Sequence, residues 1–575
     1  MMLACLAAQQ VRAQVFLPPI FDPGGRSREG APLRKEGPLK PMPPPLEPGA
    51  PAPPPEEKER LPAVRFVLKE VRLEGNTVFT ADELGAVAAP YLNRQVTTED
   101  LESLRLSLTL YYVARGYITS GAVIPDQAVA DGVIRIQIIE GKLTRIEIEG
   151  AKWLRPGYYQ RRLALSAGPP FNILTMQERL QLLQQDPRVQ RINAEHRHGV
   201  VRGESELHVR VAEYLPFKAW LTFDNYQPPV VRAERGLATI AHESLTGNGD
   251  KFLFTYGQSI PINNTTGVLP LIDTSYNLPF TAYDTSLTAA YRRTDFEIVK
   301  EPFTALNIDG HIEIFGLMLQ QPVYRTLNHQ VTLGIQGEYL YNKNSLLGIP
   351  FDFFAGYQNG VANVAALRFL QEWTYRSQDT VVGARSRFSV GLDVLDATIN
   401  SNPNVADGQF FSWLGQFQAL HRFDQWGGLQ AVGRIDLQLA NDRLFPLEQV
   451  PVGGRYSVRG YREISLLRDN SFLFSIEPRL PISRWALGLR EDLLQLAPFF
   501  DYARAWAAKG STPDPKTLAS VGVGLRSNFL PNNRGYFEVY WGYRLRVGEN
   551  NDPPYKTDGN LQDHGVHLQL VLQAF

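Results

Sequence analysis

Apolar and polar residues alternate with a period of two along much of the chain after Phe217, and this alternation predicts β-strands with two different faces. The pattern is clear in residues 331–339, 388–394 and 429–439, where one face is mostly Leu, Ile, Val and Phe. In a soluble sandwich the apolar face would pack against a second sheet, whereas in a transmembrane barrel it would face lipid. Taken one strand at a time, the two architectures have the same pattern.

The length of this strand-rich region separates the two architectures. The 359 residues from Phe217 to Phe575 contain no helical stretch. At roughly 20 to 25 residues per strand and turn, they accommodate about 16 antiparallel strands, and closing them into a cylinder removes the exposed sheet edges. We therefore predict an all-β transmembrane barrel over residues 215–575. Its interfacial aromatic girdles are expected to include Tyr276, Tyr291, Trp373, Trp506, Tyr540 and Trp541.

The region before the strands carries apolar residues at helical spacing between short strand-like segments. Thr80 and Glu83 form a capping box that begins a helix ending near Leu92. A second helix is predicted from about Thr98 to Gly116. Strands are predicted at residues 66–74, 121–124 and 133–140. Residues 63–141 therefore form an α+β unit with the order strand, helix, helix, strand, strand.

The same order of elements repeats in the next segment. Strands are predicted at residues 143–149, 189–196 and 204–213, and helices at residues 158–165 and 174–185. The periodic apolar residues of both copies are interpreted as core, and no chemistry is assigned to single residues there. Residues 142–214 are therefore predicted to be a second copy of the α+β unit.

The N-terminal residues precede both units and differ from them in composition. Residues 1–13 resemble the end of a truncated secretory signal peptide, with a short apolar core and Val11-Arg12-Ala13 at the cleavage position. Residues 14–62 are rich in proline, which lacks the backbone N–H that helices and sheets require, so a linker is predicted. A helix that could plug the barrel is not expected in this linker.

Composition and motifs exclude several functional classes. The formal net charge is −1, so the charge balance does not indicate binding to nucleic acid. Cys5 is the only cysteine, which excludes an intramolecular disulfide, and no metal or cofactor is expected. The chain has no G-x-S-x-G elbow and no P-loop, and His242-Glu243 lacks the second histidine of a zinc protease motif. We therefore do not expect an enzyme.

One stretch between two predicted strands, residues 446–463, contains three glycines and three arginines in the sequence PLEQVPVGGRYSVRGYRE. Glycine permits backbone conformations that other residues avoid, and an arginine beside it can be presented to a carboxylate. Downstream, alternation places Phe499 and Asp501 on one face of a strand and Phe500 on the other.

These motifs together resemble the two-partner secretion transporters of the outer membrane (the TpsB, or haemolysin activator and secretor, family). Val458, Arg459, Gly460 and Tyr461 spell the VRGY signature of the wider superfamily, and Phe499 with Asp501 resembles its inner-wall motif. Residues 112–127 and 182–207 resemble the two POTRA domains of such transporters, and residues 223–225 and 245–250 resemble the start of their barrel. The resemblance implies that the VRGY loop folds into the lumen, where Arg459 contacts Asp501.

The resemblance also implies the function. A transporter of this kind lies in the Gram-negative outer membrane with periplasmic POTRA domains, and it exports one large partner exoprotein without ATP. Its partners would be that exoprotein, outer-membrane lipid and, during biogenesis, the barrel-assembly machinery, which reads a terminal strand ending in Phe575. The alternative is a POTRA-barrel insertase that assembles other barrels, although such insertases usually carry more than two POTRA domains. A passive porin is a third alternative. The cargo stays open between an adhesin, a haemolysin and a toxin.

Overall fold

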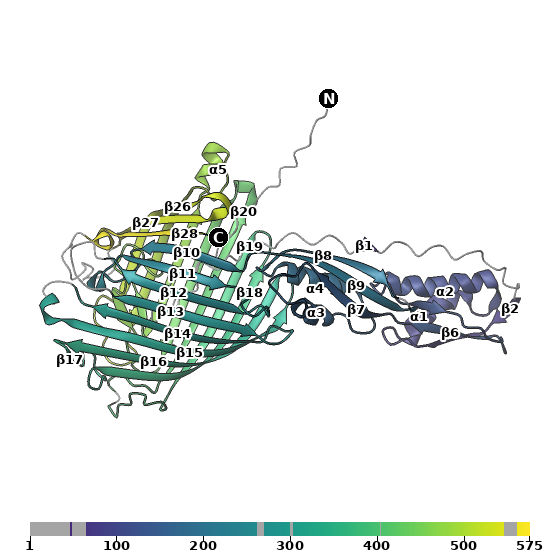
Figure 1. The fold of residues 1–575 in the computed structure, drawn as a ribbon, viewed down its shortest axis with the longest axis horizontal. Coiled ribbons are helices and arrows are strands. Elements are labelled where there is room, and N and C mark those ends of the chain that lie inside the picture. The colour runs from purple at the N-terminus through teal and green to yellow at the C-terminus, as the bar shows by residue number, and fades with distance from the viewer. Residues whose placement is uncertain are drawn as a thin grey trace. The chain divides into compact units, whose positions relative to one another are not determined.

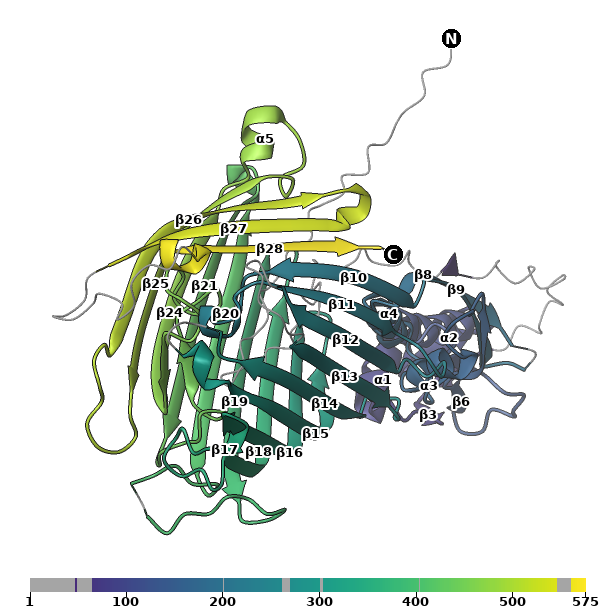
Figure 2. The same ribbon diagram turned by 60° about the vertical axis from the view of Figure 1, so that its left-hand side comes forward.

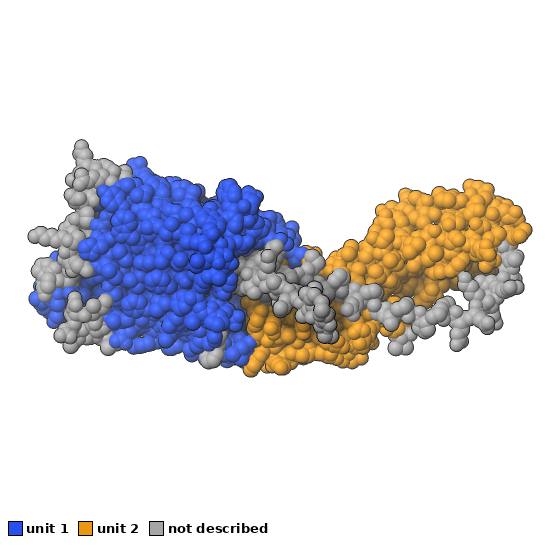
Figure 3. All heavy atoms as spheres, turned by 90° about the horizontal axis from the view of Figure 1, so that it is seen from above, with its two compact units in different colours: residues 1–39, 215–245, 249–575 blue, residues 40–214, 246–248 orange. Residues whose placement is uncertain are grey.

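The computed structural model describes residues 47–48, 65–199, 201–260, 269–299, 303–402, 404–545 and 560–574. The predicted signal peptide, and the predicted linker except Glu47–Pro48, lie outside the described residues. The described chain divides into two compact units, which are coloured separately in Figure 3: residues up to 214 together with 246–248, and residues 215–245 together with 249–574.

The first part of the N-terminal unit has the predicted α+β order with additional pairings. Its elements are β2 (Arg65–Leu68), β3 (Glu70–Glu74), α1 (Ala81–Ala88), η1 (Ala89–Tyr91), β4 (Arg94–Thr97), α2 (Thr98–Val113), β5 (Gly121–Val123) and β6 (Val133–Ile139). The capping box of Thr80 and Glu83 is present, and Thr97 with Asp100 forms another at the start of α2. The strand predicted over residues 66–74 is two strands, because β2 pairs with β4 while β3 pairs with β6.

The second part repeats this order around a core of its own. Its elements are β7 (Lys142–Glu149), α3 (Pro156–Ala164), α4 (Ile173–Gln184), β8 (Val189–His198) and β9 (Glu204–Glu213). The sheet order is β1-β8-β9-β7, where β1 (Glu47–Pro48) pairs in parallel with β8. The two cores share no residue: one is built around Tyr112 and Ile136, and the other around Leu163 and Phe171.

Both parts use the same carboxylate contact at the end of their last strand. Glu140, directly after β6, accepts hydrogen bonds from the Tyr112 hydroxyl (2.9 Å) and from backbone N–H groups of the turn after β3. Glu213, at the end of β9, accepts hydrogen bonds from the Tyr159 hydroxyl (2.8 Å) and from backbone N–H groups of the turn after β7. The repeat predicted from the sequence therefore extends to individual polar contacts.

A buried ion pair in the second part gives a stability prediction. Asp186 is buried, and its carboxylate contacts Arg188 (Nε to Oδ1, 2.8 Å) and the Tyr158 hydroxyl (2.5 Å). Burial raises the pKa of Asp186, but the charge and hydrogen bonds of Arg188 outweigh burial and bring that pKa below its ordinary value. Folding therefore favours the ionised carboxylate, so its stabilising contribution is full at neutral pH and declines as the pH falls below about 4.

Asp186→Asn is expected to lower the free energy of unfolding of the isolated 63–214 fragment by about 3 kcal/mol at pH 7. The difference from the wild type should shrink at pH 3, because the wild-type carboxyl group then takes up protons on unfolding. Urea unfolding at both pH values measures the effect, and Asp82→Asn, in the first turn of α1, is the control. Equal unfolding midpoints at pH 7 would contradict the prediction.

The C-terminal unit is a closed antiparallel barrel, as predicted, and sixteen of its described strands span it (Figures 1 and 2). They are β10 (Phe217–Asp224), β11 (Arg235–His242), β12 (Lys251–Ser259), β13 (Pro270–Pro279), β14 (Ser286–Glu297), β15 (Ile308–Arg325), β16 (His329–Leu346), β18 (Val361–Arg376), β19 (Thr380–Leu392), β20 (Phe411–Phe423), β21 (Leu429–Ala440), β24 (Asn470–Arg479), β25 (Gln495–Trp506), β26 (Thr517–Phe529), β27 (Gly535–Arg544) and β28 (Val566–Gln573). The short β17 (Ile349–Pro350) extends the β16–β18 connection, and the pair β22 (Val450–Val452) and β23 (Leu466–Arg468) forms a separate hairpin.

The remaining short helices lie in the connections of the barrel. They are η2 (Pro229–Val231), η3 (Thr304–Leu306), η4 (Asp424–Trp426), α5 (Ile482–Leu487), η5 (Pro531–Asn533) and η6 (Leu561–His564). Among the helices that the structure describes, none has the length and apolar character needed to cross a membrane.

Alternation along the strands separates an apolar outer face from a polar inner face. On β21, Ile435 and Leu439 are exposed, whereas Asp436 and Gln438 are buried inside the barrel. One girdle prediction is wrong: Tyr540 is fully buried against the ring of Phe499, while its neighbour Trp541 is exposed. Adjacent residues of a strand point to opposite faces, so these two cannot both face lipid.

The barrel closes through a short seam between β10 and β28, which lie side by side in both Figures 1 and 2. Only five residue pairs join them, Trp220–Asp224 with Gln569–Gln573. Asn225 prolongs the seam, because its side chain bonds the backbone of Val566 (3.0 Å) and Leu568 (2.9 Å). The strand β28 is paired without a register shift up to Gln573, and the terminal Phe575 lies outside the described residues.

Candidate functional site

The connection between β21 and β24 folds back into the barrel, and we call its residues 446–463 the lumen loop. Its apolar side chains are buried with residues of the barrel wall. Val458 is fully buried and Tyr461 nearly so, in a cluster that also contains Val452 of β22, Leu473 of β24 and Leu518 of β26. The Tyr461 hydroxyl donates a hydrogen bond to the Ala519 carbonyl (3.2 Å).

Arg459 is brought directly against Asp501 on the inner face of β25. The guanidinium makes a bidentate contact, with Nε 2.8 Å from Oδ2 and Nη2 2.8 Å from Oδ1 of Asp501. The backbone N–H of Arg459 donates a third hydrogen bond to Oδ2 (3.0 Å). Both side chains are buried, and a bidentate pair of this kind fixes orientation as well as position. Phe499 lies under the guanidinium, 3.7 Å from Cζ to the ring centroid.

Arg459 has a second carboxylate partner that sequence reasoning missed. Its Nη1 contacts Glu477 on β24, which also accepts a hydrogen bond from Arg479 Nε (2.7 Å). The alternation of β24 carries a signal, because Ser471, Ser475, Glu477 and Arg479 share one polar face. Which of these side chains lies opposite the loop depends on the strand register, and the sequence does not supply that register.

Gly460 is required by a close approach of two backbones. A Cβ on Gly460 would lie 2.7 Å from the carbonyl oxygen of Gly542 on β27, and its φ of +91° disfavours any L side chain. A Cβ on Gly542 would in turn lie 2.8 Å from Gly460. The loop therefore lies directly on the wall at this position, and Arg544 Nε donates a hydrogen bond to the Gly460 carbonyl (2.7 Å).

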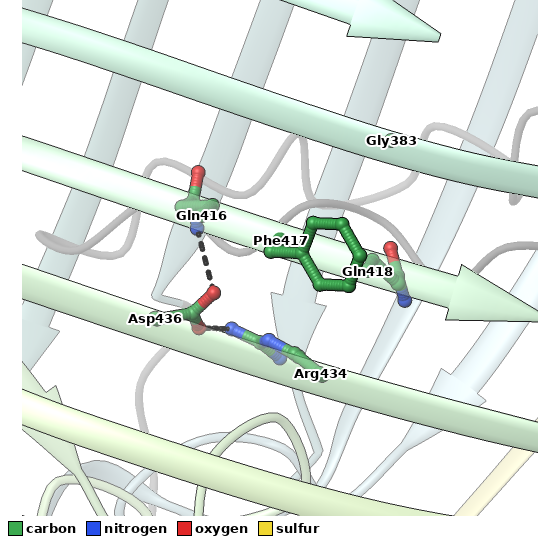
Figure 4. Close-up of a pocket in the computed structure, with 6 residues that line it drawn as sticks. All are labelled: Gly383, Gln416, Phe417, Gln418, Arg434 and Asp436. Carbon is green, nitrogen blue, oxygen red and sulfur yellow. Dashed lines mark hydrogen bonds and ion pairs between the residues drawn. The ribbon is translucent and has the colours of Figure 1, made fainter. Parts of the chain in front are cut away.

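The other two arginines of the lumen loop are also paired with carboxylates. Arg455 makes a bidentate contact with Glu538 of β27 (2.7 and 2.9 Å), and Arg462 contacts Asp563 of η6. From the wall, Arg434 on β21 donates a hydrogen bond to the Tyr456 carbonyl (2.6 Å). Figure 4 shows Arg434 beside Asp436 of the same strand, and Asp436 in turn contacts Gln416 of β20.

The first residues of the lumen loop contact the opposite side of the barrel. Arg368 on β18 is completely buried, and its guanidinium bonds Glu448 of the loop (2.7 Å), Glu338 on β16 (2.9 Å) and Ser389 on β19 (2.7 Å). Next to it, Phe445 packs edge-on against Tyr357 in an apolar cluster that also contains Leu340 of β16 and Val364 of β18. The lumen loop is therefore held at both of its ends.

Removing the Glu448 carboxylate should loosen the first part of the lumen loop. Glu448→Ala leaves Arg368 with only part of its charge compensated, and we expect a buried cation in that situation to reorganise its surroundings. Single-channel recordings should show a larger and noisier conductance than the wild type, with a smaller effect for Glu448→Gln. Asp273→Ala, which breaks an ion pair between neighbouring wall strands, is the matched control. A wild-type conductance for Glu448→Ala would contradict this prediction.

The arrangement holds a loop in place and offers no group of metal ligands. Across the described ranges, no three His, Cys, Asp or Glu side chains are placed to hold a metal ion. The chemistry of the site is charge pairing between loop arginines and wall carboxylates.

Comparison with known proteins identifies the family. Residues 203–527, more than half of the chain, match the family described as haemolysin secretion/activation protein ShlB/FhaC/HecB. The chain belongs to this family. Residues 66–141 also match the POTRA domain of ShlB type.

Individual members of the ShlB/FhaC/HecB family and related structures agree with this result. The outer membrane transporter CdiB of Dickeya dadantii is 22% identical over 408 residues, 69% of each chain. The heme/hemopexin transporter HuxB of Haemophilus influenzae is 23% identical over 47% of each chain. The structure of CdiB from Escherichia coli has a TM-score of 0.65 at 19% identity, over 92% of this chain and 94% of that one, and shows the same fold.

The ShlB/FhaC/HecB chain is thus an outer-membrane transporter of the two-partner secretion type, with its POTRA region in the periplasm. The insertase alternative is not favoured. The structure of BamA from Haemophilus ducreyi lacking POTRA domains 1–3 matches less well, with a TM-score of 0.52 at 12% identity over 88% of this chain and all of that one.

Proposed function

We propose that residues 65–214 are the receptor for a secreted partner exoprotein, and that the lumen loop holds the transport path closed until the exoprotein arrives. The proposed role of the lumen loop rests on the buried contact of Arg459 with Asp501 and Glu477. This contact fixes a long connection inside the lumen through which the exoprotein would pass. The POTRA match over residues 66–141 supports the first part.

The charges around Arg459 favour a loop that is released as a unit. Glu477 is shared by Arg459 and Arg479, and Glu538 is shared by Arg455 and Arg526. Removing one charge of a buried pair leaves its partner buried without compensation and without water. This costs more free energy than hydrating all the charges together. Entry of an exoprotein would bring water and new polar partners to the whole group. Binding and external folding of the exoprotein would then supply the free energy, without ATP.

The POTRA sheets offer edges to which an extended segment can add as a strand. Among the described strands, β7 pairs only with β9, so the eight residues Lys142–Glu149 form an end strand of their sheet. Strand addition obtains affinity from backbone hydrogen bonds and tolerates varied sequences. This mode suits capture of the N-terminal region of a long exoprotein before that region folds.

Relatives indicate the class of cargo. The relatives are named for CdiB and for heme/hemopexin transport, and the family is described by haemolysin secretion. We propose a large, β-helical exoprotein of the adhesin or haemolysin type as cargo. Outer-membrane lipid around the apolar outer face, and the barrel-assembly machinery acting on the C-terminal strand, complete the proposed set of partners.

A binding measurement tests the receptor role. The N-terminal region of the secreted partner exoprotein should bind the 63–214 fragment saturably in calorimetry. The 215–575 barrel in detergent should not bind it, and a scrambled exoprotein segment is the control for charge effects. Equal binding by the barrel alone would refute the receptor role and leave the proposed role of the lumen loop untouched.

A further inference from the structure

The turn that joins β24 to β25, residues 480–494, is built around α5 and presents three large apolar side chains to the exterior. Trp485, Leu487 and Leu489 are 49%, 67% and 48% exposed. Figures 1 and 2 both show α5 projecting past the ends of the neighbouring strands. We call these three side chains together with Trp426 the α5 patch. Soluble surfaces rarely place so many large apolar groups in one turn.

The turn is fixed to the barrel by buried polar contacts. Arg422 of β20 makes a bidentate contact with Glu491 (2.8 and 2.9 Å), and both side chains are buried. The indole N–H of Trp485 donates a hydrogen bond to the Trp426 carbonyl (3.1 Å). Ser483 is buried and bonds the backbone of Leu494 from both directions. The α5 patch is therefore presented by an ordered structure.

The α5 patch continues the outer face of the barrel. On β20, Phe411 and Phe417 are exposed on the outward face, and Phe423 has the same parity at the end of the strand. The Phe423 ring stacks on Trp426, with centroids 4.8 Å apart, and Trp426 bonds Trp485. The stack of Phe423 on Trp426, and the hydrogen bond from Trp485 to the Trp426 carbonyl, thus join the end of the outward face of β20 to α5.

Topology places the turn at the periplasmic end of the barrel. The chain enters the barrel at Phe217, directly after the POTRA region, and successive strands alternate in direction. The ends of β20 and β24 are therefore at the same end as Phe217. At that end the outer face meets the inner leaflet of the outer membrane. Arg484 and Arg490, which pair with Glu491 and Asp492 and stay partly exposed, lie beside the apolar side chains in the same turn.

We infer that the α5 patch is a membrane-interface anchor that inserts into the periplasmic leaflet of the outer membrane, with phospholipid as its ligand. Tryptophan favours the boundary between head groups and acyl chains, and a short amphipathic helix with flanking arginines lies in that plane. The anchor would fix the height and rotation of the β20–β25 wall in the membrane. This is the wall that carries Asp501 and Glu477.

A site-specific fluorophore tests the anchor in the full-length protein. Cys5 is the only cysteine, so Cys5→Ser gives a background in which Leu487→Cys can be labelled with an environment-sensitive dye. In phosphatidylethanolamine–phosphatidylglycerol vesicles, we expect a blue-shifted emission and about a twofold loss of intensity with lipids that carry a quencher near the head group. Val201→Cys, 59% exposed in the POTRA region, is the matched control and should respond only to aqueous iodide.

Each outcome decides the proposal. Adding Trp485→Ser to the labelled protein should reduce quenching by the lipid quencher. Gel mobility of heated and unheated samples checks that the barrel is still folded. Leu489→Cys provides a second labelling position. If the Leu487 label responds to iodide as strongly as the Val201 label, the turn lies in water and the anchor is refuted. If it is shielded from both quenchers, α5 packs against protein, and lipid is not its ligand.

Discussion

Arg459→Ala should reduce secretion of the partner exoprotein by about tenfold or more, because it removes the cation that two buried carboxylates share. Asp501 would then lose its guanidinium partner while Glu477 keeps Arg479, and the lumen loop would lose this attachment to β24 and β25. Asp501→Ala should impair secretion less than Arg459→Ala, since Glu477 still pairs with the guanidinium. The measurement is exoprotein in the medium at matched levels of barrel in the membrane.

The double variant distinguishes a pair from two independent residues. Arg459→Ala with Asp501→Ala should secrete about as well as Arg459→Ala alone, because both changes remove the same interaction. Arg292→Ala, which breaks an ion pair with Asp273 between β13 and β14, is the control for loss of a buried lumen charge. Fully additive losses would show that Arg459 and Asp501 do not act together.

Deleting residues 66–213 should abolish export while the barrel still reaches the membrane. The barrel closes on itself through β10 and β28, and its described strand pairings involve no residue before Phe217. Its folding should therefore survive the deletion, whereas an exoprotein in the periplasm would have no receptor. Secretion is measured with the cognate exoprotein, and barrel folding is measured by the mobility shift of heated and unheated samples on gels.

A flexible linker of the same length in place of residues 66–213 controls for spacing. It should restore no secretion, because the proposed recognition surface is still missing. Export at the wild-type level by either variant would refute the proposal that this region is the receptor for the exoprotein. An unfolded barrel in both variants would instead show that residues 66–213 are needed for assembly.

The sequence predicted the barrel well because each strand carries its own two-residue alternation. The contact between Arg459 and Asp501 was predicted through a family resemblance that covers the motifs of both residues. The sequence did not predict Glu477 or Glu448 as partners, because their contacts depend on which wall residue faces the loop after closure. Tyr540 shows a different limit: an aromatic residue near a strand end suits a girdle, but alternation lets only one of Tyr540 and Trp541 face lipid, and Tyr540 lies inside.

The split of residues 66–74 into β2 and β3 has a different cause. The sequence there reads as one continuous strand, and the interruption at Lys69 arises from competition between two partners, β4 and β6. Local propensity contains no information about such competition. Helix starts were predicted closely, because Thr80 and Glu83 act within four residues of each other.

The short seam between β10 and β28 has a consequence for the order of assembly. Asn225 and Leu568 are bonded although 343 positions separate them, so their meeting requires closure of a very long chain loop and is expected to come late. Until β28 arrives, the nascent sheet has two open edges, each able to accept a foreign strand. A chain that lacks only its last ten residues would therefore stay an unclosed sheet whose open edges can pair with other chains. Correct assembly of this transporter would then depend on its final strand.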